Sequence, residues 1–173
     1  SLITLVHLQL GKNTGTTFSR NIGLRSCSGE FIIVLDSDAY VNADALSSLQ
    51  LYLEKHKQCG IVSPKVTFPD GRYQLSTDRL PTISRKIYRY FFLRSLEKES
   101  APENVTDVDY SISAFWMFKR DLLKTVGMLD EKIFYSPEDV DYCIRVWKSG
   151  FTVTYYPMCS VIHDAQEISR SKG

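Results

Sequence analysis

The chain has 173 residues, of which 43% are hydrophobic, and its 21 lysines and arginines nearly balance 20 aspartates and glutamates. This length suits one globular domain over 1–173, and the hydrophobic fraction is too high for a disordered chain. A net charge of +1 gives no general electrostatic attraction to nucleic acid. The longest apolar run, Phe31–Leu35, fits one strand and is too short to cross a bilayer.

The four cysteines lie far apart and form neither a CxxC motif nor a Cys/His ligand spacing. We therefore expect neither a disulfide framework nor a zinc site. Unpaired thiols favour a reducing compartment, which predicts a cytoplasmic location.

Helix and strand patterns alternate through the first half: 2–8 (strand), 16–29 (helix), 31–35 (strand), 43–60 (helix) and 61–68 (strand). Thr16 or Thr17 would cap the first helix, and Asn42 the second. The uninterrupted apolar run 31–35 is typical of a strand covered on both faces of a sheet. Pro69, Asp70 and Gly71 predict a turn.

The second half continues with 83–96 (helix), 97–107 (loop), 110–119 (strand), 137–150 (helix), 152–156 (strand) and 160–163 (strand). Ser136 and Pro137 predict a well-marked helix start, with Ser as the cap, Pro in the first position and Asp139 completing a capping box. Strands that alternate with helices argue for an α/β fold, a mostly parallel sheet flanked by helices.

Two carboxylates directly follow the apolar strand 31–35. Asp36 and Asp38 lie two residues apart, so in an extended segment their side chains share a face, at the edge where open α/β sheets bind ligands. Two acids there would repel each other unless a cation lay nearby. Oxygen ligands favour Mg²⁺ or Mn²⁺, which can bridge nucleotide phosphates. The alternative interpretation is an Asx-turn with solvated acids.

A second acidic cluster, Glu138, Asp139 and Asp141, lies in the first turn of the helix expected over 137–150. The helix dipole stabilises acids there, which is a purely structural explanation. Three acids exceed what capping needs, however, and a carboxylate at a helix N-terminus can act as a general base in a cleft. Asp141 lies four residues before Arg145, which predicts a salt bridge on the helix surface.

His163 ends the last expected strand. A single histidine is more often structural than a ligand. It becomes a candidate ligand if the strand returns it beside Asp38, where the nitrogen and oxygen atoms would form a set suited to Mn²⁺.

These motifs, taken in order, resemble the family 2 glycosyltransferases, and most of all their rhamnosyltransferase-like bacterial group. The resembling segments are 13–15, 19–23, 29–38, 61–65, 69–71, 126–131, 136–145 and 150–163. Each is weak alone, but together they cover nearly the whole chain in the family's order. The resemblance implies the GT-A fold, a Rossmann-like sheet flanked by helices. One or two βα units should precede Asn13, where we predict one strand, so the domain is expected to be N-terminally truncated.

The resemblance implies a donor and metal site. Asp38 resembles the family's metal ligand, and Asp36 the residue that faces the nucleotide ribose or the metal shell. His163 resembles a further metal ligand found in some relatives. Arg20 and Asn21 occupy a stretch that lies near the nucleotide sugar in such enzymes.

The same resemblance makes Asp139 the catalytic base, with Glu138 contacting the acceptor or supporting the site. The implied reaction is inverting transfer of a sugar from a nucleotide-diphosphate donor to a hydroxyl of a glycan or lipid-linked acceptor. Mn²⁺ or Mg²⁺ would offset charge on the departing diphosphate, while a carboxylate on the opposite side takes the acceptor's proton.

The segment 84–96 mixes basic and aromatic residues. We expect a helix that packs its aromatic rings on the sheet and extends its basic groups outward. The alternative is peripheral contact with the inner face of a membrane that holds a lipid-linked acceptor.

Two other functions stay open. A phosphatase or phosphotransferase of the haloacid dehalogenase type also places two aspartates after an apolar strand, with Asp36 as nucleophile and Asp38 as acid/base. Tyr40 and the helix start at Ser136 fit that class poorly. The non-enzymatic alternative is a truncated or inactive relative that binds a sugar nucleotide or serves as an interaction module.

Overall fold

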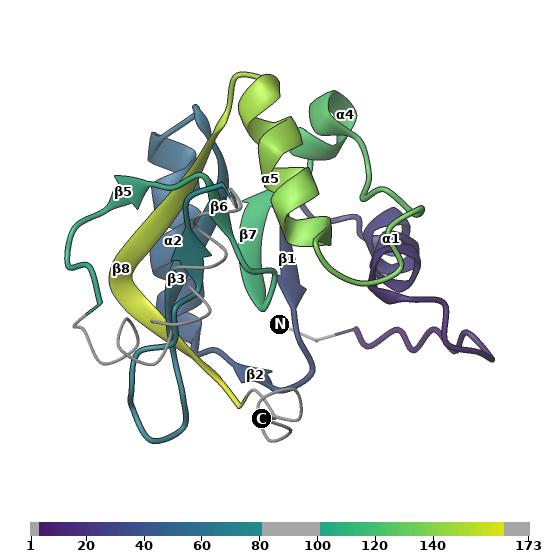
Figure 1. The fold of residues 1–173 in the computed structure, drawn as a ribbon, viewed down its shortest axis with the longest axis horizontal. Coiled ribbons are helices and arrows are strands. Elements are labelled where there is room, and N and C mark those ends of the chain that lie inside the picture. The colour runs from purple at the N-terminus through teal and green to yellow at the C-terminus, as the bar shows by residue number, and fades with distance from the viewer. Residues whose placement is uncertain (1–3, 81–100, 165–173) are drawn as a thin grey trace.

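The computed structural model describes residues 4–80 and 101–164, which form a mixed β-sheet with helices packed against it (Figure 1). The helices of this part are α1 (Thr16–Ser26), α2 (Ala43–Lys55), α4 (Leu122–Val126) and α5 (Glu138–Lys148). The strands are β1 (Phe31–Leu35), β2 (Ala39–Tyr40), β3 (Cys59–Thr67), β4 (Thr77–Asp78), β5 (Thr106–Asp107), β6 (Tyr110–Ser111), β7 (Phe115–Lys119) and β8 (Thr152–His163). The predicted α/β class is confirmed.

The main sheet has the order β1-β7-β3-β8-β2, with β5 also paired to β8. Among the described strands only β3 and β8 pair in parallel, so the prediction of a mostly parallel sheet is wrong. The cause is β7, which lies between β1 and β3 and runs opposite to both. Consequently β1, β3 and β8 point the same way, and their carboxyl ends meet at the edge where α/β sheets bind ligands.

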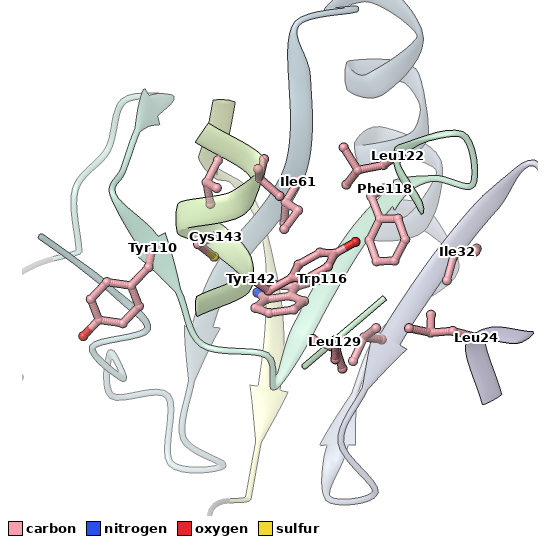
Figure 2. Packing of buried hydrophobic residues seen from close by; sticks show 13 residues of the cluster. Leu24, Ile32, Ile61, Tyr110, Trp116, Phe118, Leu122, Leu129, Tyr142 and Cys143 are labelled. Carbon is pink, nitrogen blue, oxygen red and sulfur yellow. The ribbon is translucent and has the colours of Figure 1, made fainter. Parts of the chain in front are cut away.

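Both faces of the central strands are covered. Trp116 and Phe118 of β7 join the cluster under α5, whereas Phe115 and Met117 join the cluster under α2, as the two-residue period of a strand requires. Figure 1 shows α2 and α5 on opposite faces of the sheet. Under α5, the rings of Trp116 and Tyr142 stack with centroids 5.8 Å apart (Figure 2).

Within residues 4–80 and 101–164, the edge strand β1 packs against the rest of the structure mainly through one face. Ile32 and Val34 are buried, whereas Ile33 and Leu35 are 36% and 42% exposed. The prediction that 31–35 is covered on both faces is therefore wrong, because the cluster formed with α2 draws on β3, β7 and β8 and takes in only Phe31 of β1, as a partly buried neighbour.

Four predicted strands differ from the structure. Residues 4–8, the described part of the expected strand 2–8, have no regular structure. The expected strand 110–119 is two strands in different sheets, since β6 pairs with β4. The two expected final strands form one strand, β8, whose pairing with β3 shifts register after Pro64.

The start of α2 confirms the prediction that Asn42 caps this helix. Asn42 is the N-cap, and its Oδ1 accepts a hydrogen bond of 2.7 Å from the N–H of Ala45. Leu49 and Leu53 are fully buried, while Leu46 packs against the same cluster from a half-buried position. The helix ends at Lys55, before the predicted end near residue 60.

The other two helix starts differ from the prediction. Gly15, in place of Thr16 or Thr17, is the N-cap of α1, and the helix ends at Ser26. Pro137 is the N-cap of α5, with no side-chain cap hydrogen bond, so the predicted capping box is wrong. Asp139 instead accepts a hydrogen bond of 2.8 Å from the N–H of Val140.

The helix expected over 83–96 and the segment 84–96, for which membrane contact is the alternative, lie within residues 81–100, outside the described ranges. Within the described ranges, no helix has the length and hydropathy needed to span a membrane.

Candidate active site

A cleft of about 860 Å³ lies at the carboxyl end of β1, against the start of α1 and the start of α5. Its lining includes most of the predicted site residues, namely Arg20, Asp36, Glu138, Asp139 and His163. Residues from three distant parts of the sequence therefore meet in one concave surface, as expected of a ligand site.

Asp36, Asp38 and His163 form one cluster beside this cleft. Ala39 of β2 pairs with His163 of β8, and the N–H of Asp164 donates to the carbonyl of Asp38 at 2.9 Å. The His163 Nε2 atom lies 3.3 Å from Asp38 Oδ1 and 3.9 Å from Asp36 Oδ2. The last strand thus returns His163 beside Asp38, which is the condition under which the sequence makes it a candidate ligand.

The two aspartates converge through a turn, not along an extended strand. The N–H of Ala39 donates to the carbonyl of Asp36 at 3.1 Å, which closes a turn over 36–39. Both carboxylates lie near the imidazole of His163, 3.9 Å from Nε2 for Asp36 Oδ2 and 3.3 Å for Asp38 Oδ1.

The donor set of this cluster fits a divalent cation. One ligand atom from each of Asp36, Asp38 and His163 can be chosen so that all lie within 4.8 Å of one another. Two carboxylate oxygens and one imidazole nitrogen suit Mn²⁺ better than Mg²⁺, which prefers oxygen ligands alone. The aspartate side chains are 34% and 39% exposed, which leaves access for further ligands from solvent or substrate.

Arg20 joins this cluster to the start of α5. Its Nη2 lies 2.6 Å from Asp36 Oδ1, and its Nη1 lies 3.3 Å from Glu138 Oε1. The same Nη1 donates to the Ser113 hydroxyl at 2.6 Å. Glu138 is only 6% exposed, so the guanidinium supplies the partner that a buried carboxylate requires.

Asp139 lines the cleft beside Glu138. Burial raises the pKa of the Asp139 carboxyl above its ordinary value, and the neighbouring Glu138 carboxylate adds to this rise. A carboxylate with a raised pKa is a stronger base, as general-base chemistry requires. In the same first turn of α5, Asp141 forms the predicted salt bridge with Arg145, with 2.9 Å between Oδ2 and Nε.

Asn21 does not line the cleft. Its Oδ1 accepts from the N–H of Leu129 at 3.0 Å, and its Nδ2 donates to the Leu129 carbonyl and to Glu131 at 2.9 and 3.0 Å. The side chain is buried and holds the loop before α5 against α1. Of the predicted pair, the structure brings only Arg20 into the cleft.

Sequence reasoning missed Gln74, Ser113, Phe134 and Tyr135. Gln74 and Ser113 are buried polar residues whose partners, His163 and Arg20, lie 89 and 93 residues away, so no local spacing identifies them. Phe134 and Tyr135 are 57% and 73% exposed and line the cleft. Their position just before the acidic helix start is the signal that could have found them.

The model of the family described as Glycosyl transferase family 2 matches residues 4–127. The dTDP-rhamnosyl transferase RfbF of Shigella flexneri is 24% identical over 173 residues, covering 93% of this chain and 53% of the relative. A pre-mycofactocin glycosyltransferase of Mycobacterium tuberculosis is 28% identical, covering 87% and 30%. From the same organism, N-acetylglucosaminyl-diphospho-decaprenol L-rhamnosyltransferase is 23% identical, covering 78% and 47%. The chain spans 30–53% of the length of these relatives.

Solved structures show the same fold. GalNAc-T7 with UDP, GalNAc and Mn²⁺ superposes with a TM-score of 0.62 at 14% identity, over 87% of this chain and 30% of that one. Residues 1–349 of S. aureus TarS superpose with a TM-score of 0.59 at 23% identity, over 88% of this chain and 41% of that one. The mannosyltransferase PcManGT from Pyrobaculum calidifontis with GDP-Man and Mn²⁺ superposes with a TM-score of 0.55 at 17% identity, over 89% of this chain and 37% of that one. The predicted GT-A fold is confirmed.

Proposed function

The chain belongs to glycosyl transferase family 2, and we propose that it transfers a sugar from a nucleotide-diphosphate donor to a hydroxyl of a glycan or lipid-linked acceptor, with inversion at the anomeric carbon. The observation that supports the proposal best is that Arg20 contacts both acidic clusters in one cleft, through Asp36 on one side and Glu138 on the other. One cluster suits a cation and a diphosphate, and the other offers a base.

Asp38, His163 and the Oδ2 atom of Asp36 would hold Mn²⁺ or Mg²⁺. Arg20 pairs with Asp36 through Oδ1, whereas Oδ2 of Asp36 lies on the side of His163. The ion would offset negative charge on the diphosphate leaving group. Two of the superposed structures contain Mn²⁺ with a nucleotide or a nucleotide sugar, which supports the assignment.

Asp139 is proposed as the general base that takes the proton of the acceptor hydroxyl. Its raised pKa supports this role. Displacement in line requires the base and the leaving group on opposite sides of the sugar, which two acidic clusters lining different parts of one cleft can provide. Glu138, held by Arg20, contributes to the rise in the pKa of Asp139 and would so support its basicity.

Arg20 and Asn21 are proposed to serve the nucleotide sugar in different ways. Arg20 lies on the cleft wall and would add positive charge where the diphosphate binds. Asn21 would act indirectly, by holding the loop that leads to Tyr135 and the start of α5.

The names of the relatives suggest the substrates to test first. RfbF is named for a dTDP-rhamnosyl donor, and one mycobacterial relative for a decaprenol-linked acceptor. We propose a dTDP-linked deoxyhexose as the first donor and a lipid-linked glycan as the first acceptor. Reaction in the cytoplasm, at the inner face of the membrane, follows as a prediction.

The test combines binding and transfer. Calorimetric titration with dTDP, UDP and GDP, each with Mn²⁺, identifies the nucleotide, and the matching donor then serves the transfer assay. Asp38→Ala should abolish metal-dependent nucleotide binding, whereas Asp139→Asn should keep binding and lose transfer. Asp141→Asn is the matched control, because this carboxylate pairs with Arg145 on the same helix.

Near-normal turnover by Asp139→Asn would show that the base assignment is wrong. Nucleotide binding without transfer by the unaltered chain would favour the binding-module alternative. Covalent phosphorylation of Asp36 by a phosphoryl analogue would favour the phosphatase alternative.

A further inference from the structure

We propose that Gln74 is a positioning residue that fixes the ring of His163, so that the Nε2 atom presents its lone pair to the cation site beside Asp36 and Asp38. This inference rests on the proposed function, because it assumes that the cluster holds a divalent cation.

The two ring nitrogens of His163 face different groups. Nδ1 lies 3.0 Å from Oε1 of Gln74, and Nε2 lies 3.3 Å from Oδ1 of Asp38. An amide oxygen only accepts hydrogen bonds, so this contact places the proton of a neutral ring on Nδ1 and leaves Nε2 unprotonated. Metal-binding histidines are commonly oriented in this way, by an acceptor on the second ring nitrogen.

The main chain fixes both partners. The turn after β3 returns the chain so that the N–H of Gln74 donates to the carbonyl of Val66 at 3.0 Å, and Tyr73 bridges Thr67. On the other side, β8 pairs with β3 in this region, and His163 pairs with Ala39 of β2. Gln74 and His163 are 6% and 9% exposed, so water competes little for the contact between them.

A reversed amide gives the opposite result. If the Gln74 nitrogen donated to Nδ1, the ring proton would lie on Nε2 and point at the Asp38 carboxylate, which would block coordination. The carboxylate itself favours that protonation, since it is an acceptor. The acceptor on Gln74 is therefore what would keep Nε2 available, and its removal should free the ring to move the proton to Nε2.

The test uses the full chain and Mn²⁺ alone, with free Mn²⁺ followed by electron paramagnetic resonance. Gln74→Met removes the strong acceptor at nearly constant shape and should weaken Mn²⁺ affinity about tenfold or more. Gln74→Glu keeps an acceptor oxygen and should retain the affinity. Gln50→Met is the matched control, because Gln50 is exposed on α2 and contacts Glu54.

A second readout needs no metal. Nitrogen NMR of the three histidine rings, assigned with His163→Ala, reports which nitrogen carries the proton at a pH where the ring is neutral. Gln74→Met should increase the fraction with the proton on Nε2, and Gln74→Glu should not. A side chain that only stabilised the fold would leave this fraction unchanged. Should Gln74→Met fail to fold, Gln74→Leu serves the same two measurements.

Two results overturn the inference in distinguishable ways. In the first, Gln74→Met keeps the wild-type Mn²⁺ affinity and the same ring protonation, while Asp38→Ala loses the affinity. This would show that Gln74 does not position His163, although the metal site itself exists. If Asp38→Ala and His163→Ala both kept the wild-type Mn²⁺ affinity, the cluster would not be the metal site. That result would contradict both the metal site of the proposed function and this inference.

Discussion

Arg20 and Glu138 lie on different helices, and their contact of 3.3 Å between Nη1 and Oε1 ties the start of α5 to α1. The other end of the same guanidinium pairs with Asp36, the residue that follows β1. Three elements that converge on the cleft are thus held at a common point. The proposed base and the proposed cation site therefore depend on one side chain for their relative position.

Arg20→Ala should lower the free energy of unfolding by about 1–3 kcal/mol, because it leaves the buried Glu138 carboxylate without its cationic partner. Transfer should fall by more than about tenfold, since the two halves of the site lose their alignment. Urea unfolding and initial-rate measurements check the two effects.

Arg25→Ala is the control on the same helix. Arg25 pairs with Glu131, and their side chains are 49% and 40% exposed, so its loss should cost little stability because solvent screens the pair. If Arg20→Ala and Arg25→Ala lost equal stability and equal transfer activity, Arg20 would not be the residue that holds the two acidic clusters in position.

Asp139→Asn should make the folded chain more stable at neutral pH. Burial raises the folded-state pKa of Asp139 above its unfolded value, so stability from this group is fully present below the unfolded pKa and is lost as pH rises through the folded pKa. Asparagine removes the buried charge and keeps an acceptor for the N–H of Val140. The gain in the free energy of unfolding over wild type should shrink as pH falls toward the unfolded-state pKa of Asp139. Unfolding curves measured over a pH series check this.

The same substitution should reduce transfer by about 10²-fold or more, the usual contribution of a general base. In the unaltered enzyme, transfer should fall as pH drops through the raised pKa, because only the ionised carboxylate accepts a proton. Asp141→Asn should instead lower stability by a few tenths of a kcal/mol, roughly the value of a helical ion pair. A stabilising Asp141→Asn, or a destabilising Asp139→Asn, would contradict this account.

Local chemistry explains which features could be predicted from the sequence. The N-cap at Asn42 depends on an N–H three residues away, and the acids at 36, 38 and 139 follow directly from a strand end and a helix start. The partners that complete the site are remote, because Arg20 reaches Glu138 across 118 residues and Gln74 reaches His163 across 89. No periodicity or spacing carries that information.

The sheet shows the same limit. Alternating strands and helices predict parallel pairs, but β7 enters antiparallel between β1 and β3 after a segment in which β6 belongs to another sheet. Which strands become neighbours is decided by packing of the two clusters on the sheet faces. The sequence places Asp36 and Asp38 after the carboxyl end of β1, but only the structure shows that β8 points the same way as β1 and brings His163 to that edge.

Asn42→Ala should lower the free energy of unfolding by about 1 kcal/mol, because the N–H of Ala45 loses the acceptor that caps α2. Thermal unfolding measures the loss. Ser47→Ala on the same helix is the control, since its exposed hydroxyl only donates to the carbonyl of Ala43 within the helix, and the expected change is near zero. A loss in Asn42→Ala no larger than in Ser47→Ala would show that the cap contributes nothing.

Gly15→Ala should both destabilise the chain and alter the cleft. Gly15 has a φ of 81°, and an added Cβ would lie 2.5 Å from the carbonyl oxygen of Phe134, which accepts a hydrogen bond from Thr16 at 2.8 Å. Gly150 has a φ of 83° with no atom within 4 Å of an added Cβ, so Gly150→Ala isolates the backbone strain, about 1–2 kcal/mol. Because Gly15 and Phe134 both line the cleft, we expect Gly15→Ala to cost more than Gly150→Ala in urea unfolding and to weaken nucleotide binding in calorimetry. Equal costs, with nucleotide binding unchanged in both, would show that the loop at Phe134 moves aside freely and does not shape the site.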